Sequence, residues 1–275
     1  MANRETKVVV VVPTFQSMIL IAMSDHLKKL LKPEEIVLRA VTDEAGVQKD
    51  HLKRLLIQVK PTALIAMDIQ PDTDTVAAYT TADVPIVLID EEAVGVSAIT
   101  TDNHLGGRMA GEYLISKGRR KIAIVSGRTQ VKGGYNAEQR LEGFQQALNV
   151  GRLSIPPKCM IEVPHYSRED GVEVMPKLLD AGVDAIFCAA GDNCALGLIT
   201  VAKERKVRVP DDVAIVGFDD LLIAQISTPK LTTIRQPLKE IAEVAYKMAV
   251  IQRDEILRKP QTIIFKPELV VRQSA

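Results

Sequence analysis

Short unbroken runs of Val, Ile, Leu and Ala recur along the chain and predict strands that are buried on both faces. A half-exposed strand alternates apolar and polar side chains, so an unbroken run is typical of a parallel sheet covered by helices on both sides. The runs occupy residues 8–12, 63–67, 86–89, 122–125, 185–188 and 213–216. We therefore expect most of the chain to be organised around parallel strands.

Segments with helical spacing of apolar residues lie between these runs. They occupy residues 51–57, 107–116, 140–148 and 195–203. Strand followed by helix, repeated several times, predicts the α/β class with right-handed crossovers. A chain of 275 residues is long enough for two domains of ordinary size, and we expect it to pass between two lobes near residues 100–103 and 232–237.

Polar residues follow four of the predicted strands, at or shortly after the end of each apolar run. They are Asp68, Asp90, Asp192 after Gly191, and Asp219. Open parallel sheets bind ligands beyond the carboxyl ends of their strands, so these side chains predict a polar cleft. The alternative is that each aspartate caps the helix that follows, as Asp192 would do ahead of Ala195.

Composition and charge narrow the choice of partner. The 35 basic residues cancel the 35 acidic ones, so no overall field gathers nucleic acid or a membrane surface. The three cysteines have no disulfide or zinc spacing, and no apolar run reaches the length of a secretion signal core or a membrane span. We expect a cytoplasmic protein with no cofactor and no membrane contact.

Sequence signatures of the common catalytic machineries are absent. There is no phosphate-binding loop, no dinucleotide-binding glycine pattern, no nucleophile elbow and no zinc-protease motif. The pair Asp219 and Asp220 leaves one alternative open, a metal-dependent hydrolase, although adjacent residues leaving a strand point in different directions. We do not expect an enzyme.

Six blocks in order resemble the effector domain of the lactose/galactose repressor family. They cover residues 102–107, 112–122, 140–144, 209–220, 229–237 and 267–274. The resemblance implies two similar α/β lobes of the periplasmic-binding-protein type, joined by three crossovers. The expected lobes are residues 7–101 with 237–264, and residues 102–236 with 265–275. It also implies a homodimer in which a ligand between the lobes shifts their orientation and so controls DNA binding.

The resemblance further implies which residues contact the ligand. The cleft contacts carried over are Asp90 after the fourth strand, Arg140 at the start of its helix, Asp219 after its strand, and Gln236 at the last crossover. Phe15, Asn136 and Asp192 complete the expected ligand-binding set: Asp90, Arg140, Asp219, Gln236, Phe15, Asn136 and Asp192. Arginine supplies a rigid fork of donors, while the aspartates accept hydrogen bonds from hydroxyl or amine groups.

Three departures from the family pattern change the expected ligand and role. Gly191 stands where many relatives carry Asn, and residues 17–20 replace an aromatic stretch, so we expect a sugar derivative or something less polar than a hexose. Residues 1–7 lead directly into the first strand, without the DNA-reading helix-turn-helix head, so we expect operator DNA to be bound only through a head that is missing here. A stand-alone solute-binding protein remains the main alternative.

Overall fold

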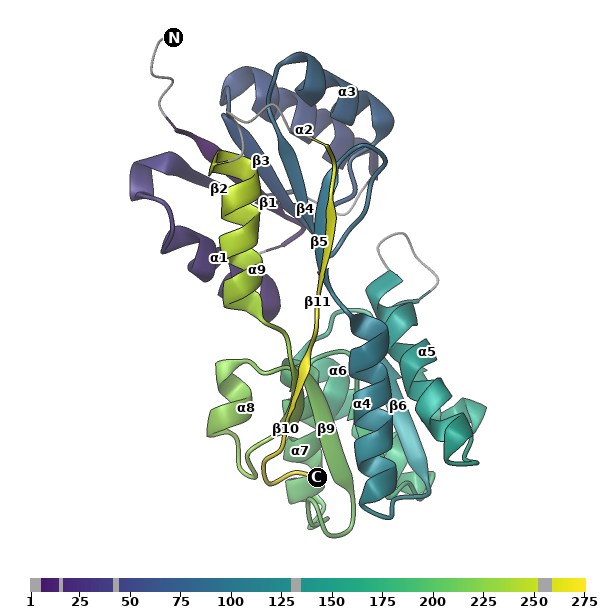
Figure 1. The fold of residues 1–275 in the computed structure, drawn as a ribbon. Coiled ribbons are helices and arrows are strands. Elements are labelled where there is room, and N and C mark those ends of the chain that lie inside the picture. The colour runs from purple at the N-terminus through teal and green to yellow at the C-terminus, as the bar shows by residue number, and fades with distance from the viewer. Residues whose placement is uncertain (1–5, 15–16, 42–44, 130–134, 252–258) are drawn as a thin grey trace. The chain divides into compact units, whose positions relative to one another are not determined.

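Two six-stranded sheets carry the fold, which we describe from a computed structural model covering residues 6–14, 17–41, 45–129, 135–251 and 259–275 (Figure 1). The chain divides into two compact units, Met1–Thr101 with Pro237–Phe265, and Asp102–Gln236 with Lys266–Ala275. It therefore passes between the units after Thr101, Gln236 and Phe265. The predicted α/β class with two lobes of this type is confirmed.

The first unit is built on a fully parallel sheet with the strand order β11-β5-β4-β3-β1-β2. Its elements are β1 (Val8–Val12), α1 (Met18–Lys28), η1 (Pro33–Glu35), β2 (Ile36–Ala40), α2 (Ala45–Gln58), β3 (Ala63–Met67), α3 (Thr73–Thr81), β4 (Ile86–Ile89), β5 (Ser97–Thr101), α9 (Leu238–Tyr246), η3 (Lys247–Ile251) and β11 (Thr262–Phe265). One face of the sheet packs against α2 and α3, where Val9 and Val11 meet Leu52, Leu55 and Tyr79. The paired helices α1 and α9 cover the other face (Figure 1).

The second unit repeats this plan with the strand order β12-β10-β9-β8-β6-β7. Its elements are α4 (Asn103–Ser116), β6 (Ile122–Ser126), α5 (Tyr135–Val150), η2 (Pro157–Cys159), β7 (Met160–Glu162), α6 (Arg168–Asp180), β8 (Ala185–Cys188), α7 (Asp192–Glu204), β9 (Ala214–Asp219), α8 (Leu222–Ile226), β10 (Thr232–Arg235) and β12 (Glu268–Val270). Only β12 runs antiparallel, against β10. Because the other strands are parallel, their carboxyl ends share one edge of the sheet.

The core of the second unit lies on both faces of its sheet. Alternate side chains of each strand point to opposite faces, so Ile122 and Ile124 pack under α4 and α5, while Ala123 and Val125 pack under α6 and α7. Phe187 and Phe144 meet on the first face with their ring centres 4.8 Å apart. Burying such side chains stabilises the unit by about 1.5–3 kcal/mol each.

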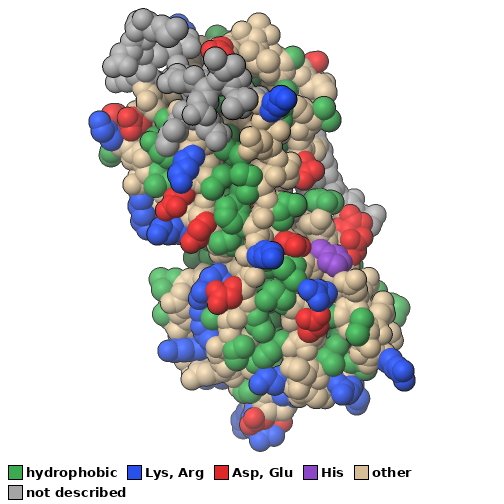
Figure 2. Space-filling view, in the orientation of Figure 1, with side chains coloured by type: hydrophobic (Ala, Val, Ile, Leu, Met, Phe, Trp, Pro, Cys, Tyr) green, Lys and Arg blue, Asp and Glu red, His purple; other side chains and the backbone are tan. Residues whose placement is uncertain are grey.

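The predicted elements appear where the apolar pattern places them. Every predicted strand is present; 122–125 extends to Ser126 as β6, and 213–216 becomes β9, which runs on to Asp219. The helical segments lie within α2, α4, α5 and α7. Basic and acidic side chains are interspersed on the face of each unit seen in Figure 2, consistent with the zero net charge. No helix in the described part of the chain is long and apolar enough to cross a membrane.

Candidate functional site

Asp219 and Gln236 end neighbouring strands of the second unit and are hydrogen-bonded to each other. Asp219 closes β9, and Gln236 directly follows β10, which pairs with β9 in parallel. Gln236 Nε2 donates to Asp219 Oδ1 at 2.7 Å, and the two residues are 4% and 8% exposed. The fold thus brings two of the predicted site residues together at the carboxyl edge.

Arg140 reaches the same edge from the neighbouring layer of helices. It lies in the second turn of α5 and not at the helix start, because the helix begins at Tyr135. Its Nη1 donates to the carbonyl oxygen of Ala189, just beyond β8, at 2.8 Å, and its guanidinium carbon lies 3.6 Å from the ring centre of Phe218. Stacking and hydrogen bonding together hold the donor fork in one orientation.

A buried amide, Asn103, connects Arg140 to another predicted residue. Asn103 opens α4 and is fully buried. Its Oδ1 accepts from Arg140 Nε at 2.7 Å, and its Nδ2 donates to Asn136 Oδ1 at 3.0 Å. Asn103 was not predicted from the sequence. Its position directly after a crossover between the two units is the sequence feature that could have indicated a site residue.

Asp192 is the first residue of α7 and is fully buried. Gly191, not Asp192, is the N-cap of α7, so the capping alternative is wrong. The Asp192 carboxylate instead accepts from the Leu221 backbone N–H at 2.7 Å and from the Thr233 hydroxyl at 2.6 Å. Burial, followed by the charge of Asp219, raises the pKa of Asp192 well above its usual value. Asp192 therefore ties the starts of α7 and α8 to β10.

Gly191 has a backbone conformation that favours glycine and lies close to the Asp219 carboxylate. Its φ is +106°, a backbone conformation that side chains rarely adopt. A Cβ built there would lie 2.8 Å from Asp219 Oδ2. The missing side chain therefore leaves room for the Asp219 carboxylate.

Asp220 does not share a ligand position with Asp219. Its side chain is 3% exposed and accepts from Arg235 Nε at 2.7 Å and from Arg272 Nη2 at 2.5 Å. Within the residues that the structure describes, no group of three or more His, Cys, Asp or Glu side chains could hold a metal ion. The two carboxylates face different partners, so the geometry gives no support to the hydrolase alternative.

Asp90 and Phe15 are the site residues predicted in the first unit. Asp90 directly follows β4 with a φ of +61°, and its Oδ1 accepts from the Thr100 hydroxyl at 3.1 Å. It therefore lies at the carboxyl edge of its own sheet. Phe15 lies outside the described residues.

Tyr166 is an aromatic residue at the carboxyl edge that we did not select from the sequence. It follows β7 with a φ of +58° and is 38% exposed. Its ring lies against Gly127, at the end of β6, where an added Cβ would meet the ring within 2.2 Å. Its position beyond the end of a strand could have indicated a site residue. The strand β7 has only three residues, however, which is too short to be recognised from the apolar pattern.

The carboxyl edge of the second unit therefore combines three kinds of group. Arg140 supplies oriented donors, Asp219 supplies a carboxylate acceptor, and Tyr166, a residue that is 38% exposed, supplies an aromatic ring. Hydroxyl groups both donate and accept, and the face of a sugar ring stacks on aromatic rings, so this set suits a small hydroxylated molecule.

Comparison with known proteins identifies the class of protein that this fold and edge define. Residues 112–275 match the family of periplasmic binding protein-like domains, which is more than half of the chain. The chain belongs to this family, and it is an effector-binding domain of the type found in LacI-family transcriptional regulators. The predicted resemblance is confirmed.

Two curated relatives are regulators and not enzymes. The chain is 33% identical over 193 residues to the HTH-type transcriptional regulator DegA of Bacillus subtilis, and 33% identical over 199 residues to the HTH-type transcriptional repressor PurR of Escherichia coli. Each match covers 70% of this chain and 56% of the relative. The matched part thus spans about half the length of these relatives.

Solved structures show the same fold over nearly the whole chain. A LacI family regulator from Enterococcus faecium with bound ribose has a TM-score of 0.86 at 24% identity, and the match covers 98% of both chains. The regulator CelR in complex with cellobiose has a TM-score of 0.82 at 25% identity, covering 98% of this chain and 86% of that one. A protein from Alkaliphilus metalliredigens complexed with D-xylulofuranose has a TM-score of 0.81 at 26% identity, covering 98% and 99%.

Proposed function

We propose that this protein senses a small hydroxylated effector, a sugar or a sugar derivative, with contacts from Arg140, Asp219, Gln236 and Asn136. The observation that carries the proposal is that a fixed donor, Arg140, and a fixed acceptor, Asp219, lie at the same sheet edge. Arg140 is held by its bond to the Ala189 carbonyl oxygen, and Asp219 by its bond from Gln236. The sugars bound by three structurally similar proteins support this class of ligand. Asp192, being fully buried, would act by holding the strand ends in place.

The effector would act by changing the relative orientation of the two units. Asp90, at the carboxyl edge of the first sheet, would supply the contact from that unit. A ligand that contacts both units in only one orientation shifts the population toward it by its difference in affinity, commonly about 1–3 kcal/mol. In the proposed full regulator, a homodimer in the cytoplasm, this shift would alter operator binding by a DNA-reading head outside the two units described.

A thermal-shift screen followed by calorimetry tests this proposal. Pentoses, hexoses, disaccharides and their phosphorylated or acidic derivatives are screened for an increase in melting temperature, and the best ligand is titrated by isothermal calorimetry. Arg140→Met should weaken binding by about 10- to 100-fold, because it removes charge-assisted hydrogen bonds while keeping apolar volume. The fold should be retained.

The matched control is Arg108→Met on α4. Arg108 is 41% exposed and pairs with Glu112 on the helix surface, so its loss removes the same charge without touching the site. This control should bind like the wild type. Equal affinity of Arg140→Met and wild type for a ligand that binds with one-to-one stoichiometry would overturn the assignment.

A further inference from the structure

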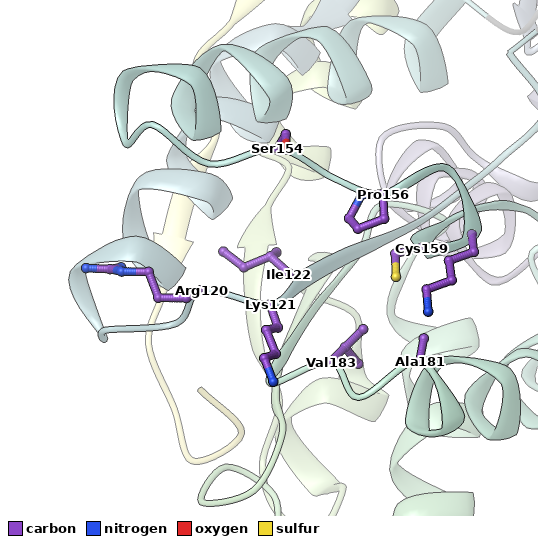
Figure 3. A pocket seen from close by; sticks show the side chains of 9 residues that line it. Arg120, Lys121, Ile122, Ser154, Pro156, Cys159, Ala181 and Val183 are labelled. Carbon is purple, nitrogen blue, oxygen red and sulfur yellow. The ribbon is translucent and has the colours of Figure 1, made fainter.

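A hollow of about 290 Å³ opens at the amino-terminal edge of the second unit's sheet (Figure 3). Ile122 at the start of β6, Cys159 at the end of η2 and Val183 ahead of β8 line it and are themselves almost fully buried. The other end of β6 carries the candidate site, roughly 16 Å away for five residues of strand. The hollow is therefore distinct from the carboxyl edge.

Hydrogen-bond donors surround this apolar floor. Lys121, Lys158 and Ser154 line the hollow and are exposed, and none of their side chains has a partner within the described part of the chain. Arg120 also lines it, but its Nη1 donates to the carbonyl oxygens of Ile115 and Arg119. Two ammonium groups and a hydroxyl remain available to a bound molecule.

No carboxylate stands among the lining residues to neutralise these lysines. Asp184, next in the chain after Val183, accepts from the backbone N–H groups of Arg120 and Lys121 at 3.0–3.2 Å, so its carboxylate is bound to the backbone beside the hollow and not to a lysine side chain. Positive charge above an apolar floor favours a ligand with one anionic end and one apolar end.

We propose that this hollow binds a small organic anion, with a carboxylate or phosphate head between Lys121 and Lys158 and an apolar body on Ile122 and Val183. The volume lies near the lower limit of about 300 Å³ for small-molecule pockets, which selects a single ring or a short chain. The site is independent of the proposed effector site, because it uses other residues at the opposite edge.

Methyl NMR of the whole chain, with labelled Ile and Val, tests the proposal. The probes are benzoate and phenyl phosphate, which carry different anionic heads on the same ring, and benzyl alcohol, the neutral counterpart. Saturable shifts at the Ile122 and Val183 methyl groups are expected with both anions. Benzyl alcohol should bind at least about tenfold more weakly, because its neutral hydroxyl group makes no charge-assisted hydrogen bond with the lysines. Equal binding of the alcohol, or shifts confined to other methyl groups, would overturn the proposal.

Charge-removing variants locate the anion. Lys121→Met and Lys158→Met should each weaken benzoate binding by about fivefold, as expected for exposed ion pairs, and the double variant by more than about tenfold. Lys203→Met, an exposed lysine on α7 that does not line the hollow, is the matched control and should bind like the wild type. Arg140→Met should also keep the shifts, which separates this site from the effector site. A folded double variant that binds benzoate like the wild type would refute the site.

Discussion

Gly107 of α4 lies against α5 at Arg140. The substitution Gly107→Ala tests how closely the two helices pack there. The carbonyl oxygen of Arg140 would lie only 2.0 Å from the added Cβ, and real Cβ contacts essentially never fall below 3.0 Å. The two helices must therefore separate by at least about 1 Å at this crossing. The clash is with backbone, so no side-chain rotation relieves it.

The expected cost follows from this geometry. Forcing an extra methyl group into a packed interface costs about 1–3 kcal/mol, and a backbone clash belongs at the upper end. For a domain of this size, about 3 kcal/mol corresponds to a fall of roughly 6–12 °C in melting temperature. A 1 Å shift would also stretch the 2.7 Å bond between Arg140 Nε and Asn103 Oδ1 beyond hydrogen-bonding distance. We therefore expect the effector response to be lost as well.

Urea unfolding followed by circular dichroism, with Gly151→Ala as the matched control, measures this cost. A Cβ on Gly151 would meet Ile115 Cδ1 at 2.9 Å, the movable end of a side chain. The control should lose less than about 1 kcal/mol. If Gly107→Ala and Gly151→Ala unfold at the same urea concentration, the helices are not interlocked as described.

Three further substitutions test other contacts. Asp220→Ala should destabilise the second unit by about 2–4 kcal/mol, because it leaves Arg272, which is 13% exposed, without its carboxylate; a urea midpoint equal to that of the wild type would contradict this. Because the pKa of Asp192 is raised, the folded state holds that proton more tightly than the unfolded chain, so the contribution of Asp192 to stability falls as pH rises from about 4 through the raised pKa. Asp192→Asn should remove this pH-dependent contribution from the free energy of unfolding, measured from about pH 4 upward. A pH dependence equal to that of the wild type would count against the raised pKa of Asp192. Val216→Asp should abolish cooperative unfolding of the second unit, because Val216 is 0% exposed and the charge would be buried without a partner; a normal thermal transition would refute this.

The sequence predicted the central strands of both sheets but missed the outer ones, among them the strands that lead into the crossovers. The strand β10 contains Thr232 and Thr233, which interrupt the apolar pattern although both are fully buried. The Thr233 hydroxyl donates to Asp192, and the Thr232 hydroxyl accepts from the Arg272 backbone N–H. Buried polar residues are tolerated where they have partners, and these partners lie about 40 residues away in the sequence, so apolar periodicity cannot reveal such a strand.

The carboxyl-edge rule predicted where Asp219 lies, and the family resemblance added Gln236. The fold brings these two residues together, because parallel strands end at one edge whatever the loops between them do. Asn103 and Tyr166 were missed for a different reason. A buried amide and an exposed ring gain their roles from neighbours on other elements, and a single sequence does not show which elements those are.

Gly191 shows why an absent side chain has to be interpreted in three dimensions. The family pattern indicates that this glycine replaces an amide that would bind a hydroxyl group. Its φ of +106° and the 2.8 Å from its built Cβ to Asp219 Oδ2 give a second reason, since a side chain there would strain the backbone and displace the carboxylate. In the proposed site, the same glycine would lack one amide contact to a ligand and would leave room for the Asp219 carboxylate. A ligand suited to this edge would depend more on Asp219 and less on the start of α7 than one bound by relatives with asparagine at this position.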